Sequence, residues 1–219
     1  MSAETYLILA PHHDDESIGC GGSIKLLTKG GAHVHLAVVT SGCVGVPGAS
    51  GNQASRIREK ETLSACEILG IQDATFLRLK DLALEFNEAN LHAIVEIVRK
   101  VRPTTIFLPH QQEMDRDHRI VNELGREASW IAGLPGVLPA IEPILHRIRK
   151  LFYEVWTPMQ TPHESRVIDD VWEDKIRAIQ QHQSQLQGAD YVRMATGLNQ
   201  FRAIQQFTDG VYAESFSHS

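Results

Sequence analysis

Short apolar runs alternate with amphipathic segments along most of the chain, and this alternation limits the folds it can adopt. Runs of strand length cover residues 6–10, 33–40, 75–79, 104–109 and 151–157. Segments with helical periodicity cover residues 19–27, 58–69, 91–98 and 117–130. Strands that alternate with helices are typical of a parallel sheet. The sequence therefore predicts an α/β fold with a Rossmann-like, mostly parallel sheet flanked by helices on both faces.

Two segments break this alternation and are predicted to be irregular. Residues 44–52 and 132–143 are rich in glycine and proline, which favour loops. Farther on, a late helix is expected to carry one stripe of inward-facing residues, namely Ile168, Trp172, Lys175, Ile179, His182 and Leu186. No internal repeat or long linker interrupts the 219 residues. One domain spanning 1–219 is the simplest prediction.

Composition narrows the class of partner and the compartment. A formal net charge of -6 disfavours a nucleic-acid surface, which needs clustered lysine and arginine. The three cysteines form no CxxC pair, which favours a reducing compartment over a disulfide framework. No apolar run reaches the length of a signal core or a membrane span. We expect a cytoplasmic protein without membrane insertion.

The most informative segment follows the first expected strand, where five ionisable side chains run from His12 to Glu16. The carboxyl edge of an open parallel sheet is where ligands bind. Adjacent carboxylates in a half-buried turn repel one another, so a neutralising cation explains the cluster. A solvated helix start is the alternative. It would account for Asp15 and Glu16 but not for two adjacent histidines.

A second polar segment, residues 109–118, follows the fourth expected strand and ends at His118. Both segments leave the same sheet edge, so they can converge in space. Histidine and carboxylate are standard zinc ligands, and a three-ligand site with an open position is typical of catalytic zinc. The sequence therefore predicts a catalytic Zn²⁺ site.

These segments resemble the LmbE-like zinc-dependent deacetylases, the family of the N-acetylglucosaminyl-phosphatidylinositol de-N-acetylases. The family motif Ala-His-Pro-Asp-Asp-Glu is matched at 12–16 with His13 in place of proline, and His-x-Asp-His is matched in part at 115–118. Weaker similarity covers Arg58 to Gly70, Lys175 to Gln185 and Tyr212 to Glu214. The resemblance implies hydrolysis of an amide, namely de-N-acetylation of an N-acetylglucosamine-type amino sugar or conjugate.

Carried over by position, the resemblance implies His12, Asp15 and His118 as zinc ligands and Asp14 as general base. It further implies that Asp117 orients a ligand. The family has histidine where this chain has Asp115, and that histidine serves as an oxyanion donor. Another donor should replace it. The candidates are His110 and His182, of which we favour His182.

Other polar residues have two possible roles each. Arg58 either binds a substrate hydroxyl or phosphate, or pairs with Glu61 on one helix face. Lys175 and His182 interrupt an apolar stripe, and a satisfied core histidine is the alternative for His182. His13 is expected to point away from the metal. The glycines at 19–22 are expected to let the first helix pack closely on the sheet, with Cys20 buried and inert.

Two other functions stay open at this stage. A metal-dependent phosphoesterase would need further carboxylates to bridge two metals. A binding protein that has lost activity would explain the departure at Asp115. Substrate specificity is expected from the loops 44–52 and 132–143. A homo-oligomer is possible, as in related enzymes.

Overall fold

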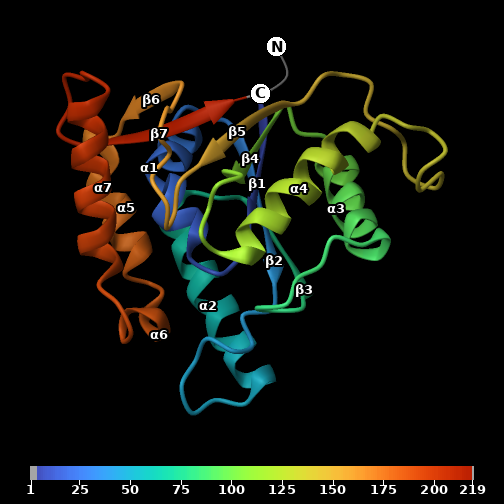
Figure 1. Ribbon diagram of the computed structural model, residues 1–219, viewed down its shortest axis with the longest axis horizontal. Helices are drawn as coiled ribbons and strands as arrows, with labels where there is room; N and C mark the ends of the chain where they lie inside the picture. Colours follow the sequence, from blue (N-terminus) through green and yellow to red (C-terminus); the bar gives the residue numbers. More distant parts are fainter. Residues whose placement is uncertain (1–3, 219) are drawn as a thin grey trace.

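The computed structural model describes residues 4–218 and contains a seven-stranded sheet (Figure 1). The strand order is β3-β2-β1-β4-β5-β7-β6. The strands are β1 (Thr5–Ala10), β2 (His33–Thr40), β3 (Asp73–Leu79), β4 (Thr105–Pro109), β5 (Arg149–Tyr153), β6 (Glu164–Val167) and β7 (Ala213–His218). Strands β1 to β5 are parallel, and β7 is antiparallel to both of its neighbours. The predicted Rossmann-like, mostly parallel sheet is confirmed.

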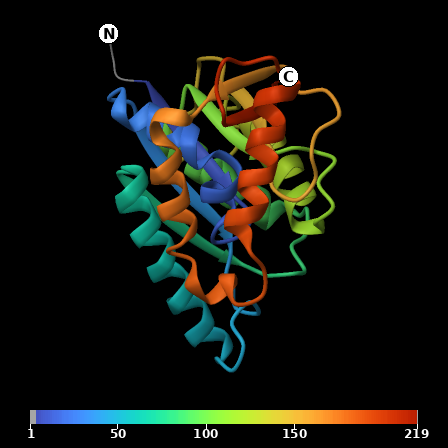
Figure 2. The same cartoon turned by 90° about the vertical axis from the view of Figure 1, so that its left-hand side faces the viewer.

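Helices cover both faces of the sheet (Figures 1 and 2). They are α1 (Asp15–Lys29), α2 (Gly51–Leu69), α3 (Glu88–Val101), α4 (Arg116–Ile131), α5 (Trp172–Ile179), α6 (Gln183–Leu186) and α7 (Tyr191–Gln205), with a 3-10 turn at Asp169–Val171. One buried cluster joins the sheet to α1, α2, α5 and α7, and a second joins it to α3 and α4. Strand β1 serves both, because its side chains alternate: Ile8 belongs to the first cluster and Leu9 to the second. None of the helices in residues 4–218 has the length and apolar character needed to cross a membrane.

The structure departs from the sequence prediction in three places. Helix α1 begins at Asp15 instead of Gly19, so Asp15 and Glu16 of the polar cluster lie in its first turn. Elements β6, α7 and β7 were not predicted. The continuous late helix is wrong, because α5 ends at Ile179 and His182 lies in the turn before α6. That turn brings the His182 imidazole to within 3.3 Å of Glu16.

A single arginine organises the irregular loop after α4. The Arg99 side chain is fully buried and donates to backbone carbonyls of the loop, those of Ala132, Leu134, Val137, Leu138 and Ile141. The loop follows the C-terminal end of α4, and the 16 residues of that helix span about 24 Å. It therefore lies far from the polar segments, which meet at the start of α4.

A buried ion pair fixes the C-terminal strand to α1 and α5. The Lys175 ammonium lies 2.6 Å from the Glu214 carboxylate, and both side chains are fully buried. Glu214 also accepts the backbone N–H groups of Gly22 and Ser23. The two carboxylate oxygens of Glu214 thus accept three donors, as a buried charge requires. Lys175 is therefore a structural residue.

Gly19 allows α1 to approach β5, as the sequence predicted. A Cβ atom there would lie 2.5 Å from the Tyr153 ring and 2.8 Å from the Glu154 carbonyl oxygen. We expect Gly19→Ala to lower the free energy of unfolding by about 1–3 kcal/mol, the usual cost of overpacking. Gly197, inside α7, meets nothing within 4 Å, so Gly197→Ala should instead stabilise by roughly 0.5–1 kcal/mol. Urea denaturation of both variants checks this, and equal midpoints would contradict it.

Candidate active site

Two loops converge because β1 and β4 are neighbours in the sheet. Strand β1 ends at Ala10 and β4 ends at Pro109, and both run in the same direction. The polar segments predicted to meet therefore leave the sheet side by side. His118 lies in the first turn of α4, fully buried, and faces His12 across the junction. The two imidazole rings are 5.2 Å apart between centroids.

Three of the predicted ligand atoms form a compact triangle. His12 Nδ1 lies 3.2 Å from His118 Nε2 and 3.4 Å from Asp15 Oδ2, and the latter two atoms are 3.2 Å apart. A tetrahedral zinc ion with bonds of about 2.0–2.1 Å sets its ligand atoms about 3.3–3.4 Å apart. The second Asp15 oxygen is buried and has no hydrogen-bond partner. The residues therefore fit one zinc ion by donor type and by spacing.

The electrostatics of this triangle favour positive charge. Burial lowers the pKa of His12, but Asp117 and Asp15 outweigh it and raise that pKa to about 10. Burial raises the pKa of Asp15, but His118 and His12 hold it well below its usual range. Carboxylates close to imidazoles thus stabilise cationic charge at this point. A divalent cation supplies such charge.

The other nitrogen of each histidine faces a carboxylate. His12 Nε2 lies 3.5 Å from Asp117 Oδ2 and 3.7 Å from Asp81 Oδ1. His118 Nδ1 lies 3.9 Å from the buried Glu113 carboxylate. Glu113 also accepts backbone N–H groups of residues 155–157. Such partners orient ligating imidazoles, which agrees with the expectation for Asp117.

Asp14 has a strained backbone at the start of α1. Its φ is 138°, a value that non-glycine residues seldom adopt and that costs about 1–3 kcal/mol. Burial raises the pKa of its carboxyl to about 6, the Arg58 guanidinium opposes that shift, and Asp15 adds to it. Arg58 Nη2 lies 3.4 Å from Asp14 Oδ2 and donates to the His13 carbonyl oxygen. A strained, buried carboxylate at a cavity is typical of a catalytic group.

Two sequence alternatives are resolved by these contacts. Arg58 does not pair with Glu61, whose carboxylate accepts the N–H and hydroxyl of Ser184 instead. His13 points away from the triangle, as expected, with Nδ1 3.0 Å from the Thr62 hydroxyl and its ring stacked on Phe76.

A cavity of about 250 Å³ opens beside the triangle. It is lined by His12, Asp14, Val44, Gly45, Arg58, Asp81, Leu82, Asp115, Trp156, Gln185 and Tyr191. Val44 and Gly45 belong to the loop 44–52, which was expected to contribute to substrate specificity and does line the cavity. The second loop supplies nothing, so its predicted role in specificity is wrong: it lies beyond the far end of α4.

The two candidate oxyanion donors both lie outside this lining. His110 Nε2 donates to the Thr157 carbonyl oxygen at 2.6 Å, and His110 lines a separate cavity of about 350 Å³ on the other side of that strand connection. His182 is fully buried, with Nε2 3.3 Å from Glu16 Oε1 and from the Ser17 hydroxyl. Burial lowers the pKa of His182, but Glu16 outweighs it and the net shift is upward.

Glu16 connects His182 to Asp14. Its second carboxylate oxygen accepts the Asp14 backbone N–H at 3.2 Å. His182 therefore supports the turn that carries Asp14, while its Nδ1 is buried without a partner.

The sequence alone assigned no role to Glu16, Glu113, Asp81, Trp156 or Tyr191. The position of Asp81 could have indicated a place in the site, because Asp81 follows β3 at the same carboxyl edge of the sheet.

Two histidines and one carboxylate spaced to fit a metal lie beside the Asp14 carboxylate, an arrangement suited to metal-dependent hydrolysis. The chain belongs to the family described as PIG-L, GlcNAc-PI de-N-acetylase, which matches residues 7–129. That span contains the triangle and Asp14. The resemblance drawn from the motifs is thereby confirmed.

The relatives that this chain resembles are named as deacetylases. The chain is 34% identical over 190 residues to diacetylchitobiose deacetylase of Thermococcus kodakarensis, covering 82% of this chain and 69% of the relative. It is 31% identical over 188 residues to a probable N-acetyl-alpha-D-glucosaminyl L-malate deacetylase 2 of Bacillus cereus, covering 82% of each. The crystal structure of N,N'-diacetylchitobiose deacetylase from Pyrococcus horikoshii superposes with a TM-score of 0.89 at 26% identity, covering 100% of this chain and 84% of that one.

Proposed function

We propose that this protein is a zinc-dependent hydrolase that removes the acetyl group from an N-acetylglucosamine-type amino sugar or conjugate. The observation that carries the proposal is the Asp14 carboxylate beside the triangle of His12, Asp15 and His118 at one cavity. A metal site with an adjacent unligated carboxylate is suited to hydrolysis. The named relatives act on N-acetylated sugars, which supports this substrate class.

Zinc bound by His12, Asp15 and His118 would lower the pKa of a water molecule and polarise the acetyl carbonyl. Asp14 accepts one proton from the attacking water as the new carbon–oxygen bond forms. The carbonyl π electrons move to oxygen and then return as the carbon–nitrogen bond breaks. Asp14 delivers its proton to the leaving nitrogen, which gives acetic acid and a free amine; the acid proton then passes to the amine, so the products are acetate and an amino sugar with a protonated amine.

The remaining cavity groups bind and orient. Arg58 holds the Asp14 turn through the His13 carbonyl and lines the cavity, where it can also donate to a substrate hydroxyl. Asp117 Oδ2 lies 3.5 Å from His12 Nε2, and a carboxylate at that nitrogen favours the ring orientation with Nδ1 toward the metal. Asp117 is therefore a positioning residue in this proposal.

A two-metal phosphoesterase fits these contacts less well. Asp117 and Asp81 approach Nε2 of the same His12 whose Nδ1 belongs to the triangle. A second metal there would require one imidazole to bridge both ions, whereas a proton on Nε2, 3.5 Å from the Asp117 carboxylate, accounts for the pair without a second ion. An inactive binding protein is disfavoured because the ligand triangle and Asp14 are complete.

The test is acetate release from a small panel of N-acetylglucosamine glycosides, followed as free amine and as acetate in equal amounts. We expect turnover in protein that holds about one zinc per chain, loss of turnover after dialysis against a chelator, and recovery with zinc. Two metals per chain together with phosphate release from sugar phosphates would overturn the proposal in favour of the phosphoesterase.

His182→Ala tests the late histidine. We expect a rate constant at least about tenfold lower with unchanged zinc content, because either an oxyanion donor or the support of Glu16 is lost. The affinity for a phosphonamidate analogue of the tetrahedral intermediate separates these two roles. If His182 is an oxyanion donor, His182→Ala should weaken binding of the analogue by the same factor as it lowers kcat/KM; if His182 only supports Glu16, it should not. Normal turnover in His182→Ala would leave the donor among the cavity residues Arg58 and Tyr191.

We further propose a reducing, cytoplasmic location and a homo-oligomeric state. The first is supported by free thiols at Cys20, Cys43 and Cys66, two of them buried. Mass determination in solution tests the second.

A further inference from the structure

The wall of the catalytic cavity carries more carboxylates than cations. Asp14, Asp81 and Asp115 line it, and Arg58 is the single lysine or arginine among the lining residues. Arg58 is already engaged with Asp14 and the His13 carbonyl oxygen. The cavity therefore offers little free positive charge to a substrate.

A bound metal does not reverse this balance. Arg58 offsets Asp14, with which it pairs. A divalent ion offsets Asp15, which binds it, and one of the other nearby carboxylates, Asp81, Asp115 and Asp117. Two carboxylate charges remain near the cavity without a partner cation: Asp81 and Asp115 line the cavity, whereas Asp117 contacts His12 outside the lining. Like charges brought together at a binding site disfavour association.

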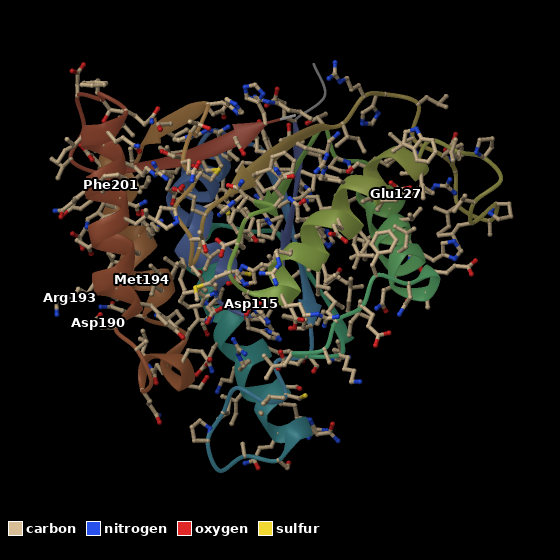
Figure 3. The ribbon with its side chains drawn as sticks, in the orientation of Figure 1. Asp115, Glu127, Asp190, Arg193, Met194 and Phe201 are labelled. Atoms are coloured by element: carbon tan, nitrogen blue, oxygen red, sulfur yellow. The ribbon has the colours of Figure 1, made fainter. Side chains whose placement is uncertain are left out.

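Asp115 brings one of these charges to the cavity wall for a structural reason. It is the N-cap of α4, and its Oδ1 accepts the backbone N–H groups of Asp117 and His118. Both hydrogen bonds are on Oδ1; the residue lines the cavity, and one of its carboxylate oxygens lies within 4.8 Å of ring nitrogens of His12 and His118. The side chain is half-buried, which limits screening by solvent. Figure 3 shows Asp115 at the start of α4, with Glu127 near the other end of the helix.

The rest of the lining suits an uncharged ring. Trp156 and Tyr191 form an edge-to-face pair with centroids 5.4 Å apart, and both are half-buried. Exposed Val44 and Leu82 add apolar area at the mouth. Aromatic side chains provide apolar faces with a polar tip. A sugar ring matches them, because its faces are C–H groups and its edge is hydroxyl groups.

We propose that the cavity selects N-acetylglucosamine substrates whose attached group is uncharged or carries a free ammonium, and disfavours those that carry a carboxylate or phosphate. This inference rests on the proposed function and deepens it. It separates two substrate chemistries found among the relatives: a neutral disaccharide and a malate conjugate.

The test compares kcat/KM for three N-acetylglucosaminides that differ in the attached group: methyl (neutral), glucosamine (cationic) and malate (anionic). We expect the malate conjugate to be about tenfold or more below the other two at low salt. Added salt should narrow the gap, because it screens the carboxylates.

Asp115→Asn tests whether Asp115 is the source of the discrimination against the malate conjugate, since asparagine keeps the helix cap and removes the charge. It should raise the malate-to-methyl ratio of kcat/KM about threefold to tenfold, the size expected of one like-charge pair a few ångströms apart in bulk water. The matched control is Glu127→Gln, which removes one charge from the same helix outside the cavity and should leave the ratio as in wild type.

Each outcome is decisive. A malate conjugate hydrolysed as well as the methyl glycoside overturns the inference but leaves de-N-acetylation standing. Equal ratios in wild type and Asp115→Asn show that Asp115 is not the source and also overturn it. No acetate release from any of the three overturns the proposed function itself.

Discussion

Asp14→Asn is expected to lower turnover by at least about a hundredfold while zinc stays bound. The triangle of His12, Asp15 and His118 does not include Asp14, so its ligand atoms are unchanged. The amide cannot accept the proton of the attacking water, and loss of a general base costs about 10²–10⁴ in rate. Single-turnover kinetics with metal analysis of the same sample makes the measurement.

The neighbouring carboxylate provides the control. Asp15→Asn should weaken metal binding directly, so equal zinc loss in both variants would contradict the division of roles. Asp14→Gly is a second control, which separates the role of the Asp14 side chain in catalysis from a role in folding. Glycine tolerates a φ of 138°, so this variant should be inactive yet at least as stable as wild type in urea. A large loss of stability in Asp14→Gly would mean that the side chain is needed for folding.

The second large effect is expected from His118→Ala, which removes one of the three ligands. The affinity for zinc should fall by more than about a hundredfold, because even loss of a partner outside the ligand set costs about 10–100-fold. Activity should fall with it and return in part at high zinc concentration. Competition with a chromophoric chelator measures the affinity.

His146→Ala is the matched control, since His146 is exposed and bonds only to the Pro103 carbonyl oxygen among residues 4–218. It should keep the zinc affinity of wild type. Full metal content in His118→Ala would overturn the ligand set.

The central strands β1, β2 and β4 were predictable because they are buried on both faces of the sheet. Ile8 and Leu9 belong to opposite buried clusters, so consecutive residues of β1 must be apolar. Such a continuous apolar run indicates a buried strand. Helix α7 was missed because its buried face is small and polar: Ala195, Asn199, Arg202 and Ala203. Such a face has no apolar periodicity. The antiparallel strands β6 and β7 were missed for a related reason, since polar residues occupy seven of their ten positions.

The core of the site was predictable because its residues stand together in the sequence. His12 to Glu16 form one run, and His118 follows a neighbouring strand. The walls of the cavity were not predictable, since Trp156, Gln185 and Tyr191 come from three separate places: the loop after β5, α6 and the start of α7. The break before α6 was also unpredictable, because a regular spacing concealed the turn at His182.

The position of β7 has a consequence for how the chain acquires its structure during synthesis. Residues 213–218 lie between β5 and β6 in the sheet, although they follow both in the sequence. Until the ribosome has delivered them, β6 has no strand to pair with, and Lys175 has no carboxylate at Glu214. The parallel half, β1 to β4, can assemble earlier. At about 5–20 residues per second, the later half stays open for several seconds, the interval in which chaperones would bind it.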